Sequence, residues 1–191
     1  MSKTNISIRE AVINDAPLIA EVVAMAIGDE AALTSYCGKD YIKTLTDVAM
    51  SEHSQYSYRN TLIAEADGKP AGAIVGYDGG KLHAMRSVTY SIINALTGNT
   101  PSIPDETEAG EFYLDSLAVI SSFRGKGIGK QLIEAMRDKA FNEGHTSVGL
   151  IVDFDNPRAE ALYTSLGFMR INKKTFLGHD MWHMQSINTA K

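Results

Sequence analysis

The chain reads Arg124-Gly125-Lys126-Gly127-Ile128-Gly129-Lys130 where a strand-like apolar run, residues 112–120, gives way to an amphipathic, helix-like run, residues 128–141. The glycines let the backbone approach a ligand closely, because they carry no Cβ. The first N–H groups of a helix have no partners within it, and the helix dipole favours an anion at that end. Three basic side chains, Arg124, Lys126 and Lys130, add positive charge at the same place. The stretch therefore predicts a turn that binds a pyrophosphate.

Two better-known phosphate-binding motifs do not fit this stretch. A P-loop aligned on Gly129-Lys130 has Arg124 in place of its first glycine and Gln131 in place of the hydroxyl residue that binds Mg²⁺. A dinucleotide fingerprint begun at Gly125 has Lys130 in place of its third glycine, and a start at the next glycine fails in the same way. What remains is the pattern Arg-x-x-Gly-x-Gly between a strand and a helix.

The rest of the chain alternates further strand-like and helix-like runs around this turn. The predicted strands are residues 6–9, 61–65, 71–77, 111–119, 147–152, 168–171 and 181–185. The predicted helices are residues 16–27, 40–51, 81–97, 128–141 and 157–166. Asp15 is expected to cap the first helix, and Asp67-Gly68 to form a hairpin turn. This order predicts an α/β fold, a mixed sheet with helices on both faces.

Length and composition fit one globular domain over residues 1–191, with a helical insertion around 81–97 and an acidic loop around 99–110. A net charge of −5 argues against a nucleic-acid partner. The single cysteine, Cys37, excludes an internal disulfide, and a packed side chain is expected there rather than a nucleophile. No apolar run approaches about 18 residues, and no signal-like segment opens the chain, so a cytoplasmic protein without a membrane partner is expected.

Three segments together resemble the GNAT superfamily of general-control-related N-acetyltransferases. They are Leu117-Ala118-Val119, Arg124-Gly125-Lys126-Gly127-Ile128-Gly129, and Asn156-Pro157-Arg158-Ala159-Glu160-Ala161-Leu162-Tyr163 followed by Gly167-Phe168. The close match covers residues 111–168, and Ile8-Arg9-x-Ala11 is a weaker echo of the usual opening of the family. The resemblance implies a mostly antiparallel sheet of about six to seven strands with helices on both faces, splayed between its two central strands.

The resemblance also implies acetyl-CoA as co-substrate, held where the central strands separate. Backbone groups of Leu117, Ala118 and Val119 would pair with the pantetheine arm, and Asn156 would contact the arm from the other side. The amides of residues 125–130 would hold the pyrophosphate, assisted by Arg124 and Lys126. Ser121 and Phe123 stand where family members often have proline and tyrosine, but neither change removes a backbone donor.

Acyl transfer from a thioester to an amine requires a base for the ammonium and an acid for the leaving thiolate, because their pKa values are near 10.4 and 8.5. Tyr163, two helical turns after Asn156, stands where the family places the acid; the alternative is a buried tyrosine that supports the sheet. Glu111 and Asp115 are the candidate bases, expected on one strand face with Leu117 and Val119 if no bulge intervenes. A salt bridge to a neighbouring helix would satisfy Asp115 equally well.

The acceptor is expected to be a small-molecule or peptide amine. No lysine or arginine lies between Arg86 and Arg124, whereas five acidic residues do, and such a segment either attracts a cationic amine or is simply solvated.

The His179 and His183 spacing is not a helical ligand pair, so no metal site is predicted. An O-acylation, a longer acyl donor and a homodimer stay open, and the alternative function is a catalytically silent acyl-CoA-binding sensor.

Overall fold

The strands form one seven-stranded sheet in the order β1-β2-β3-β4-β5-β7-β6 in the computed structural model, which describes residues 4–189. All neighbouring strands are antiparallel except β4 and β5, which are parallel. The predicted mixed, mostly antiparallel sheet is therefore confirmed. The strands are β1 Ile6–Glu10, β2 Thr61–Ala66, β3 Lys69–Asp78, β4 Phe112–Val119, β5 Ser147–Asp153, β6 Met169–Phe176 and β7 His179–Ile187.

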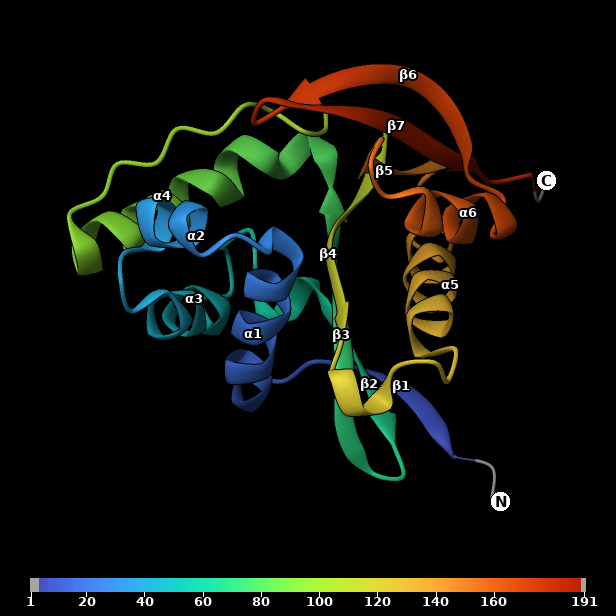
Figure 1. Ribbon diagram of the computed structural model, residues 1–191, viewed down its shortest axis with the longest axis horizontal. Coiled ribbons are helices and arrows are strands. Elements are labelled where there is room, and N and C mark those ends of the chain that lie inside the picture. The colour runs from blue at the N-terminus through green and yellow to red at the C-terminus, as the bar shows by residue number, and fades with distance from the viewer. Residues whose placement is uncertain (1–3, 190–191) are drawn as a thin grey trace.

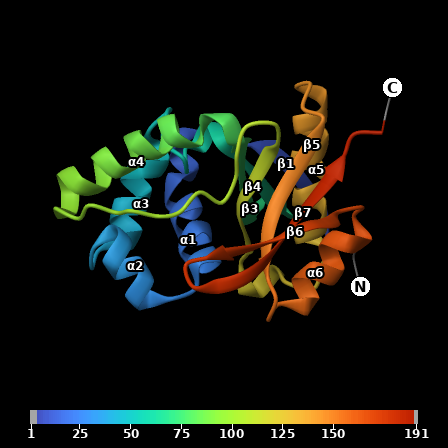
Figure 2. The ribbon, with the colours of Figure 1, turned by 90° about the horizontal axis from the view of Figure 1, so that it is seen from above.

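Helices cover both faces of the sheet, as Figure 1 shows in side view and Figure 2 from above. One face carries α1 Ala16–Ile27, α2 Glu30–Cys37, α3 Tyr41–Met50 and α4 Leu82–Thr97, and the other carries α5 Ile128–Asn142 and α6 Pro157–Ser165. Each face packs on its own apolar cluster, one around Ile19, Leu45 and Ile63 and one around Leu132, Met136 and Phe168. The sheet therefore separates two cores, here called the α1 face and the α5 face.

Most predicted elements are present, with two local differences. The segment 30–37 was not predicted as a helix, yet it forms α2, whose N-terminus is capped by Asp29 through a 2.6 Å bond from the Ala32 amide. Asp15 stands at the predicted cap position of α1, but its carboxylate accepts hydrogen bonds from Arg9 and from the Val12 amide instead of capping the helix. The hairpin turn at Asp67 and Gly68 has φ of 51° and 76°, as an Asp-Gly turn requires.

A β-bulge in β4 changes which residues share a face. Val75 of β3 pairs with Ser116 and the next residue, Gly76, pairs with Leu114, so Asp115 is the extra residue. Asp115 was expected to share a face with Leu117 and Val119 only in the absence of a bulge, and the bulge removes it from that face. Tyr113 packs in the cluster on the α1 face, whereas Leu114, Leu117 and Val119 pack in the cluster on the α5 face.

The two central strands separate soon after they pair. β4 pairs with β5 only at Phe112↔Val148 and Tyr113↔Gly149, while β5 pairs with β7 from Ser147↔Ile187 to Asp153↔Met181. The splay that the family resemblance implies is thus present, and beyond Tyr113 one edge of β4 has no strand partner. None of the helices within residues 4–189 is long and apolar enough to span a bilayer.

Candidate active site

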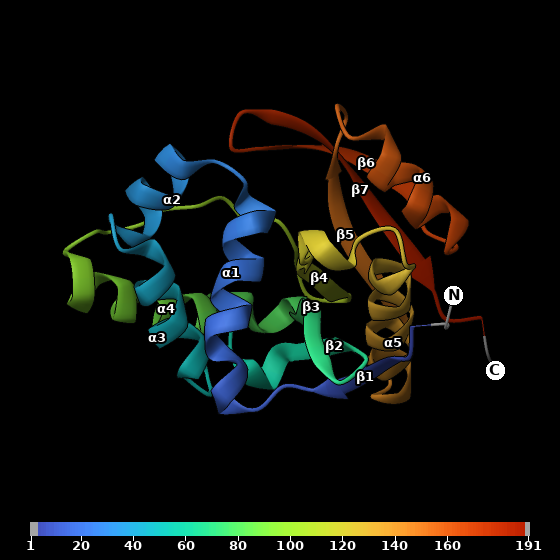
Figure 3. The ribbon, with the colours of Figure 1, turned by 60° about the horizontal axis from the view of Figure 1, so that its bottom comes forward.

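The glycine-rich turn leads from the splayed end of β4 into α5, the yellow segment in Figure 3. Gly125 and Gly127 have φ of 78° and 76°, in the left-handed region that favours glycine, and a Cβ at either position would meet nothing within 4 Å. Among the described residues, no amide from position 125 to 130 donates to a backbone carbonyl; the first to do so is Gln131, which donates to Gly127. A row of amides without backbone acceptors thus stands at the N-terminus of a helix.

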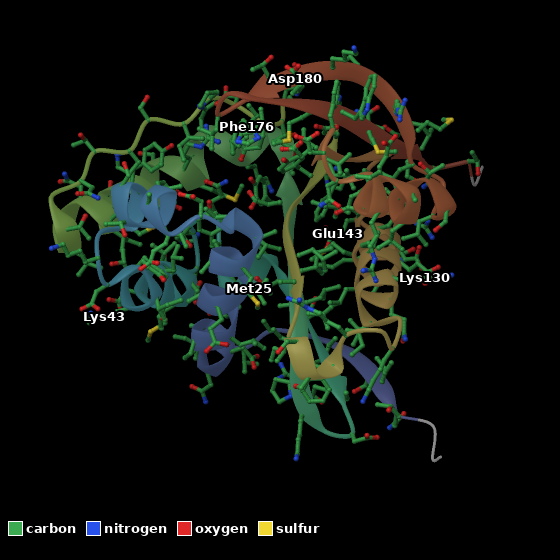
Figure 4. The ribbon with its side chains drawn as sticks, in the orientation of Figure 1. Met25, Lys43, Lys130, Glu143, Phe176 and Asp180 are labelled. Carbon is green, nitrogen blue, oxygen red and sulfur yellow. The ribbon has the colours of Figure 1, made fainter. Side chains whose placement is uncertain are left out.

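The basic side chains of the turn are held against neighbouring groups. Arg124 Nε donates to the Val119 carbonyl at 3.0 Å, and Lys126 Nζ lies 5.5 Å from the centre of the Phe123 ring. Lys130 Nζ is 3.9 Å from Glu134, at the limit of an ion pair, and Lys130 projects from the α5 side in Figure 4. All three charges therefore remain near the row of amides.

The unpaired edge of β4 runs directly into this turn. Leu117, Ala118 and Val119 pair with β3 on one side only, and each is half-buried. Across the splay, Asn156 caps α6 by accepting the Ala159 amide at 3.2 Å. The cofactor residues expected from the sequence therefore lie on the unpaired part of β4, on the turn after it and just after the end of β5, around the splay of the two strands, here called the opening.

Tyr163 lies on the α5 side of that opening, on α6. Its ring meets Phe168 edge-on, with centroids 6.0 Å apart, and it packs against the cluster on the α5 face. Burial raises the pKa of the Tyr163 hydroxyl, so the group is protonated at neutral pH. The hydroxyl makes no hydrogen bond within residues 4–189, which leaves its proton available to a ligand.

Asp115 lies on the α1 side, at the bulge, and is half-buried among polar side chains. Its Oδ2 accepts from the Tyr77 hydroxyl at 2.5 Å and from Gln55 Nε2 at 2.9 Å, and its Oδ1 accepts from the Ser116 hydroxyl at 2.7 Å. Among residues 4–189 Asp115 forms no salt bridge to a helix, and hydrogen bonds from neutral side chains satisfy it instead of the ion pair considered from the sequence. Burial and the charge of Asp115 raise the pKa of the Tyr77 hydroxyl, which therefore acts as a donor.

Sequence reasoning missed a second carboxylate beside Asp115. Glu106, from the acidic loop, is 5% exposed, and its Oε1 lies 3.1 Å from Gln55 Nε2 and 3.3 Å from the Tyr77 oxygen. Its Oε2 accepts from Arg86 of α4. The loop had been noted for its acidity, but nothing in its pattern distinguishes a buried glutamate from a solvated one.

Glu111 lies in a different, fully buried network. The side chain is 2% exposed and accepts from Thr107 at 2.7 Å and from Gln185 at 2.7 Å, and His183 Nε2 lies 2.8 Å away. The carboxylate sits directly over Gly149, where a Cβ would come within 1.9 Å of Glu111 Oε2. Glu111 thus ties β4 to β7 across β5 and does not reach the half-buried opening around Asp115.

The β6–β7 hairpin extends toward α1 and α2, as Figures 2 and 3 show. In Figure 4, Met25 of α1 and Phe176 of the hairpin lie on the same side of β4, opposite Lys130. Lys174 fastens the hairpin by donating to the Glu106 carbonyl at 3.0 Å. Within residues 4–189 no cluster of three or more His, Cys, Asp or Glu side chains could hold a metal ion.

The fold and the glycine-rich turn define an acetyltransferase. Residues 31–168 match the model of the Acetyltransferase (GNAT) family, so the chain belongs to this family and is an acyltransferase. A solved acetyltransferase structure is 31% identical with a TM-score of 0.82, covering 95% of this chain and 98% of that chain. An N-acetyltransferase from Staphylococcus aureus Mu50 has a TM-score of 0.80 at 23% identity, covering 94% of this chain and 99% of that one.

Two curated relatives carry names for particular reactions. N-alpha-acetyltransferase 30 of Saccharomyces cerevisiae is 38% identical over 102 residues, which are 48% of this chain and 57% of that protein. Mycothiol acetyltransferase of Renibacterium salmoninarum is 40% identical over 70 residues, which are 37% of this chain and 20% of that protein. The chain thus spans little more than half of the first of these relatives and about a fifth of the second.

Proposed function

We propose that the chain transfers the acetyl group of acetyl-CoA to an amine by direct attack in a ternary complex. The observation that carries this proposal is the row of free amides at residues 125–130, continuous with the unpaired edge of β4. A helix N-terminus with free amides suits a pyrophosphate, and an unpaired strand edge suits the amide-containing pantetheine arm. The residues present therefore fit CoA.

Within this proposal, each part of the cofactor site has a distinct role. The amides of residues 125–130 bind the pyrophosphate, with Arg124 and Lys126 adding charge. Leu117, Ala118 and Val119 bind the pantetheine arm through their backbone, and Asn156 contacts it from across the splay. Bound acetyl-CoA supplies an activated thioester, whose carbonyl an amide of β4 near Val119 polarises.

Asp115 and Tyr163 perform the proton transfers from opposite sides of the opening. Asp115 takes one proton from the ammonium of the acceptor, and the neutral amine then attacks, so that the C–N bond forms as the C–S bond breaks. Tyr163 gives its proton to the departing sulfur, and the second proton of the nitrogen restores the Tyr163 hydroxyl. Asp115 is half-buried at the bulge, whereas Glu111 is 2% exposed, so we assign the base to Asp115. The difference in exposure between the two carboxylates supports this assignment.

The acceptor in this proposal is an amine that arrives as a cation. Asp115 and Glu106 place two carboxylates beside the opening, and tyrosine rings surround them, an environment that attracts an ammonium group. The name of the N-alpha-acetyltransferase relative supports transfer to nitrogen. Proteins, peptides and small molecules with a primary amine form the substrate class.

The experiment is a screen of amines with acetyl-CoA, measuring release of the CoA thiol. We expect release above the hydrolysis background for a subset of primary amines, and a matching acetylated product by mass spectrometry. An enzyme that binds acetyl-CoA in calorimetry but releases no thiol with any amine would instead support the sensor alternative. Alcohols of the same shape serve as matched controls, and equal rates with them would refute the assignment to nitrogen.

A further inference from the structure

Two carboxylates on the α1 face share the same pair of hydrogen-bond donors. The Tyr77 hydroxyl lies 2.5 Å from Asp115 Oδ2 and 3.3 Å from Glu106 Oε1, and Gln55 Nε2 lies 2.9 Å and 3.1 Å from the same two oxygens. Tyr77 has a single proton, which goes to the nearer oxygen, that of Asp115. The two oxygens are thus within reach of the same donors, and their charges act on each other.

The two carboxylates come from different parts of the chain and differ in exposure. Asp115 lies at the bulge of β4 and is half-buried, whereas Glu106 lies in the long loop between α4 and β4 and is 5% exposed. Burial, and then the charge of Asp115, raise the pKa of Glu106 above its usual range.

Arg86 holds Glu106 in place from α4. Its guanidinium is 7% exposed and contacts Glu106 Oε2, and its other arm donates to Asp105 at 2.8 Å and to the Ile103 carbonyl at 3.0 Å. One positive charge thus opposes the two negative charges of the pair. Because Arg86 bonds Oε2, on the side of Glu106 away from the shared donors, it offsets the repulsion only in part.

The other titratable groups around the pair are neutral tyrosines, apart from two charged neighbours. Burial raises the pKa of each of these tyrosine hydroxyls, so none carries charge at neutral pH. The tyrosines are Tyr36 of α2, Tyr56 of the segment after α3, Tyr77 of β3, Tyr90 of α4 and Tyr113 of β4. The charged neighbours are Asp105, which pairs with Arg86, and Lys174 of β6, whose ammonium binds the Glu106 carbonyl.

We infer that Glu106 is a positioning residue of the reaction: Arg86 holds its carboxylate beside the base Asp115, where both carboxylates contact the Tyr77 hydroxyl and the Gln55 amide. The inference rests on the proposed function, in which Asp115 receives the proton of the acceptor. Glu106 competes for the two donors that orient Asp115, and a charge on Glu106 acts on Asp115 at short range.

The test is the pH dependence of kcat/KM for the wild type and for two variants that remove charges of opposite sign. Glu106→Gln removes the negative charge, so the acidic limb of the profile should move to lower pH by about one unit. Arg86→Gln removes the positive charge, so the same limb should move to higher pH by a similar amount. In both variants the KM for acetyl-CoA should stay within about twofold of wild type, because both residues lie on the acceptor side.

Asp105→Asn is the matched control, since it also removes an acidic partner of Arg86 and changes the net charge equally. Asp105 does not touch the donors shared by the pair, so its effect on the limb should be a small fraction of that of Glu106→Gln. Glu106→Asp, which keeps the charge, should restore the wild-type limb. Circular dichroism and thermal melts confirm that each variant is folded, and Arg86 in Glu106→Gln keeps its bonds to Asp105 and Ile103.

Failure of this inference can be told apart from failure of the proposed function. If Asp115→Asn loses turnover but Glu106→Gln and Arg86→Gln leave the limb unmoved, or move it in the same direction, Glu106 has only a structural role. If Asp115→Asn keeps full turnover, the assignment of the base itself is wrong. Equal shifts of the acidic limb in Glu106→Gln and Asp105→Asn would mean that net surface charge causes the shift, and this result would also overturn the inference.

Discussion

The two sides of β4 offer a ligand different kinds of groups. On the α5 side, the proposed cofactor site consists mainly of backbone: free amides at residues 125–130 and an unpaired strand edge. On the α1 side, the proposed acceptor site consists of side chains from β3, β4 and two loops, with Asp115, Glu106 and Tyr77 at its centre. A backbone site depends on conformation and a side-chain site on residue identity, so the two sides should respond differently to mutation.

The largest expected effect is that of removing the charge of Asp115. Asp115→Asn keeps the shape of the side chain but cannot accept a proton, so kcat should fall about 100- to 1,000-fold while the acetyl-CoA dissociation constant changes little. Steady-state rates and calorimetry measure the two quantities separately. Equal losses of kcat and of affinity for acetyl-CoA would mean that the two sides of β4 do not act independently.

Tyr163→Phe should have the next largest effect, and it probes the side chain on the cofactor side that is proposed to transfer a proton. The variant keeps the ring that packs on Phe168 and loses only the hydroxyl, so kcat should fall about 10- to 100-fold with the fold intact. A good leaving thiol needs no acid, so acetyl donors with more acidic thiols should narrow the difference from wild type. Unchanged turnover would leave Tyr163 as a packing residue.

Gly127→Val tests whether conformation alone supports the cofactor site. A β-branched residue at φ 76° costs about 1–2 kcal/mol, and the turn should relax and weaken acetyl-CoA binding roughly tenfold. Gly98→Val is the matched control: its φ is 74° with open space around it, but it ends α4, away from the turn. Both variants should lose similar stability in thermal melts, and only Gly127→Val should lose affinity by calorimetry.

The same contrast explains which features of the molecule could be predicted from the sequence. The turn at residues 124–130 and the capping Asn156 are local in the sequence, and the structure places them around one opening. The bulge at Asp115 was not predicted, because it depends on the register with β3 and leaves the alternation in β4 looking regular. The α2 helix is short and weakly amphipathic, and packing against α3 and α4 rather than its own periodicity stabilises it.

The acceptor site was the least predictable part for the same reason. Glu106 becomes a neighbour of Asp115 only because Arg86, earlier in the chain on α4, draws the loop inward. Gln55 lies 60 positions before Asp115 in a segment with no motif. Contacts of this kind follow from the tertiary fold, so the sequence identified an acidic region but not the pair within it.

The smallest expected effect concerns Glu111, the candidate base that the structure places in a buried network. Burial opposes its ionisation, but hydrogen bonds from His183, Thr107 and Gln185 outweigh it and leave the pKa of Glu111 below its usual range. As the pH falls, Glu111 takes up a proton near pH 4.3 in the unfolded chain and only at a lower pH in the folded state. Its contribution to stability is thus present above about pH 4.3 and is lost as the pH falls through the lower pKa of the folded state.

Glu111→Gln should therefore flatten the loss of Tm between pH 5 and pH 3 while lowering Tm at pH 7, since the amide cannot satisfy all three partners. The acidic limb of kcat/KM should stay where it is in wild type, in contrast to Glu106→Gln, because Glu111 does not share donors with Asp115. Glu21→Gln, at an exposed position of α1, controls for the change in net charge. If the acidic limb moved in Glu111→Gln, Glu111 would act on Asp115, which would contradict the separate hydrogen-bond networks of these two carboxylates in the structure.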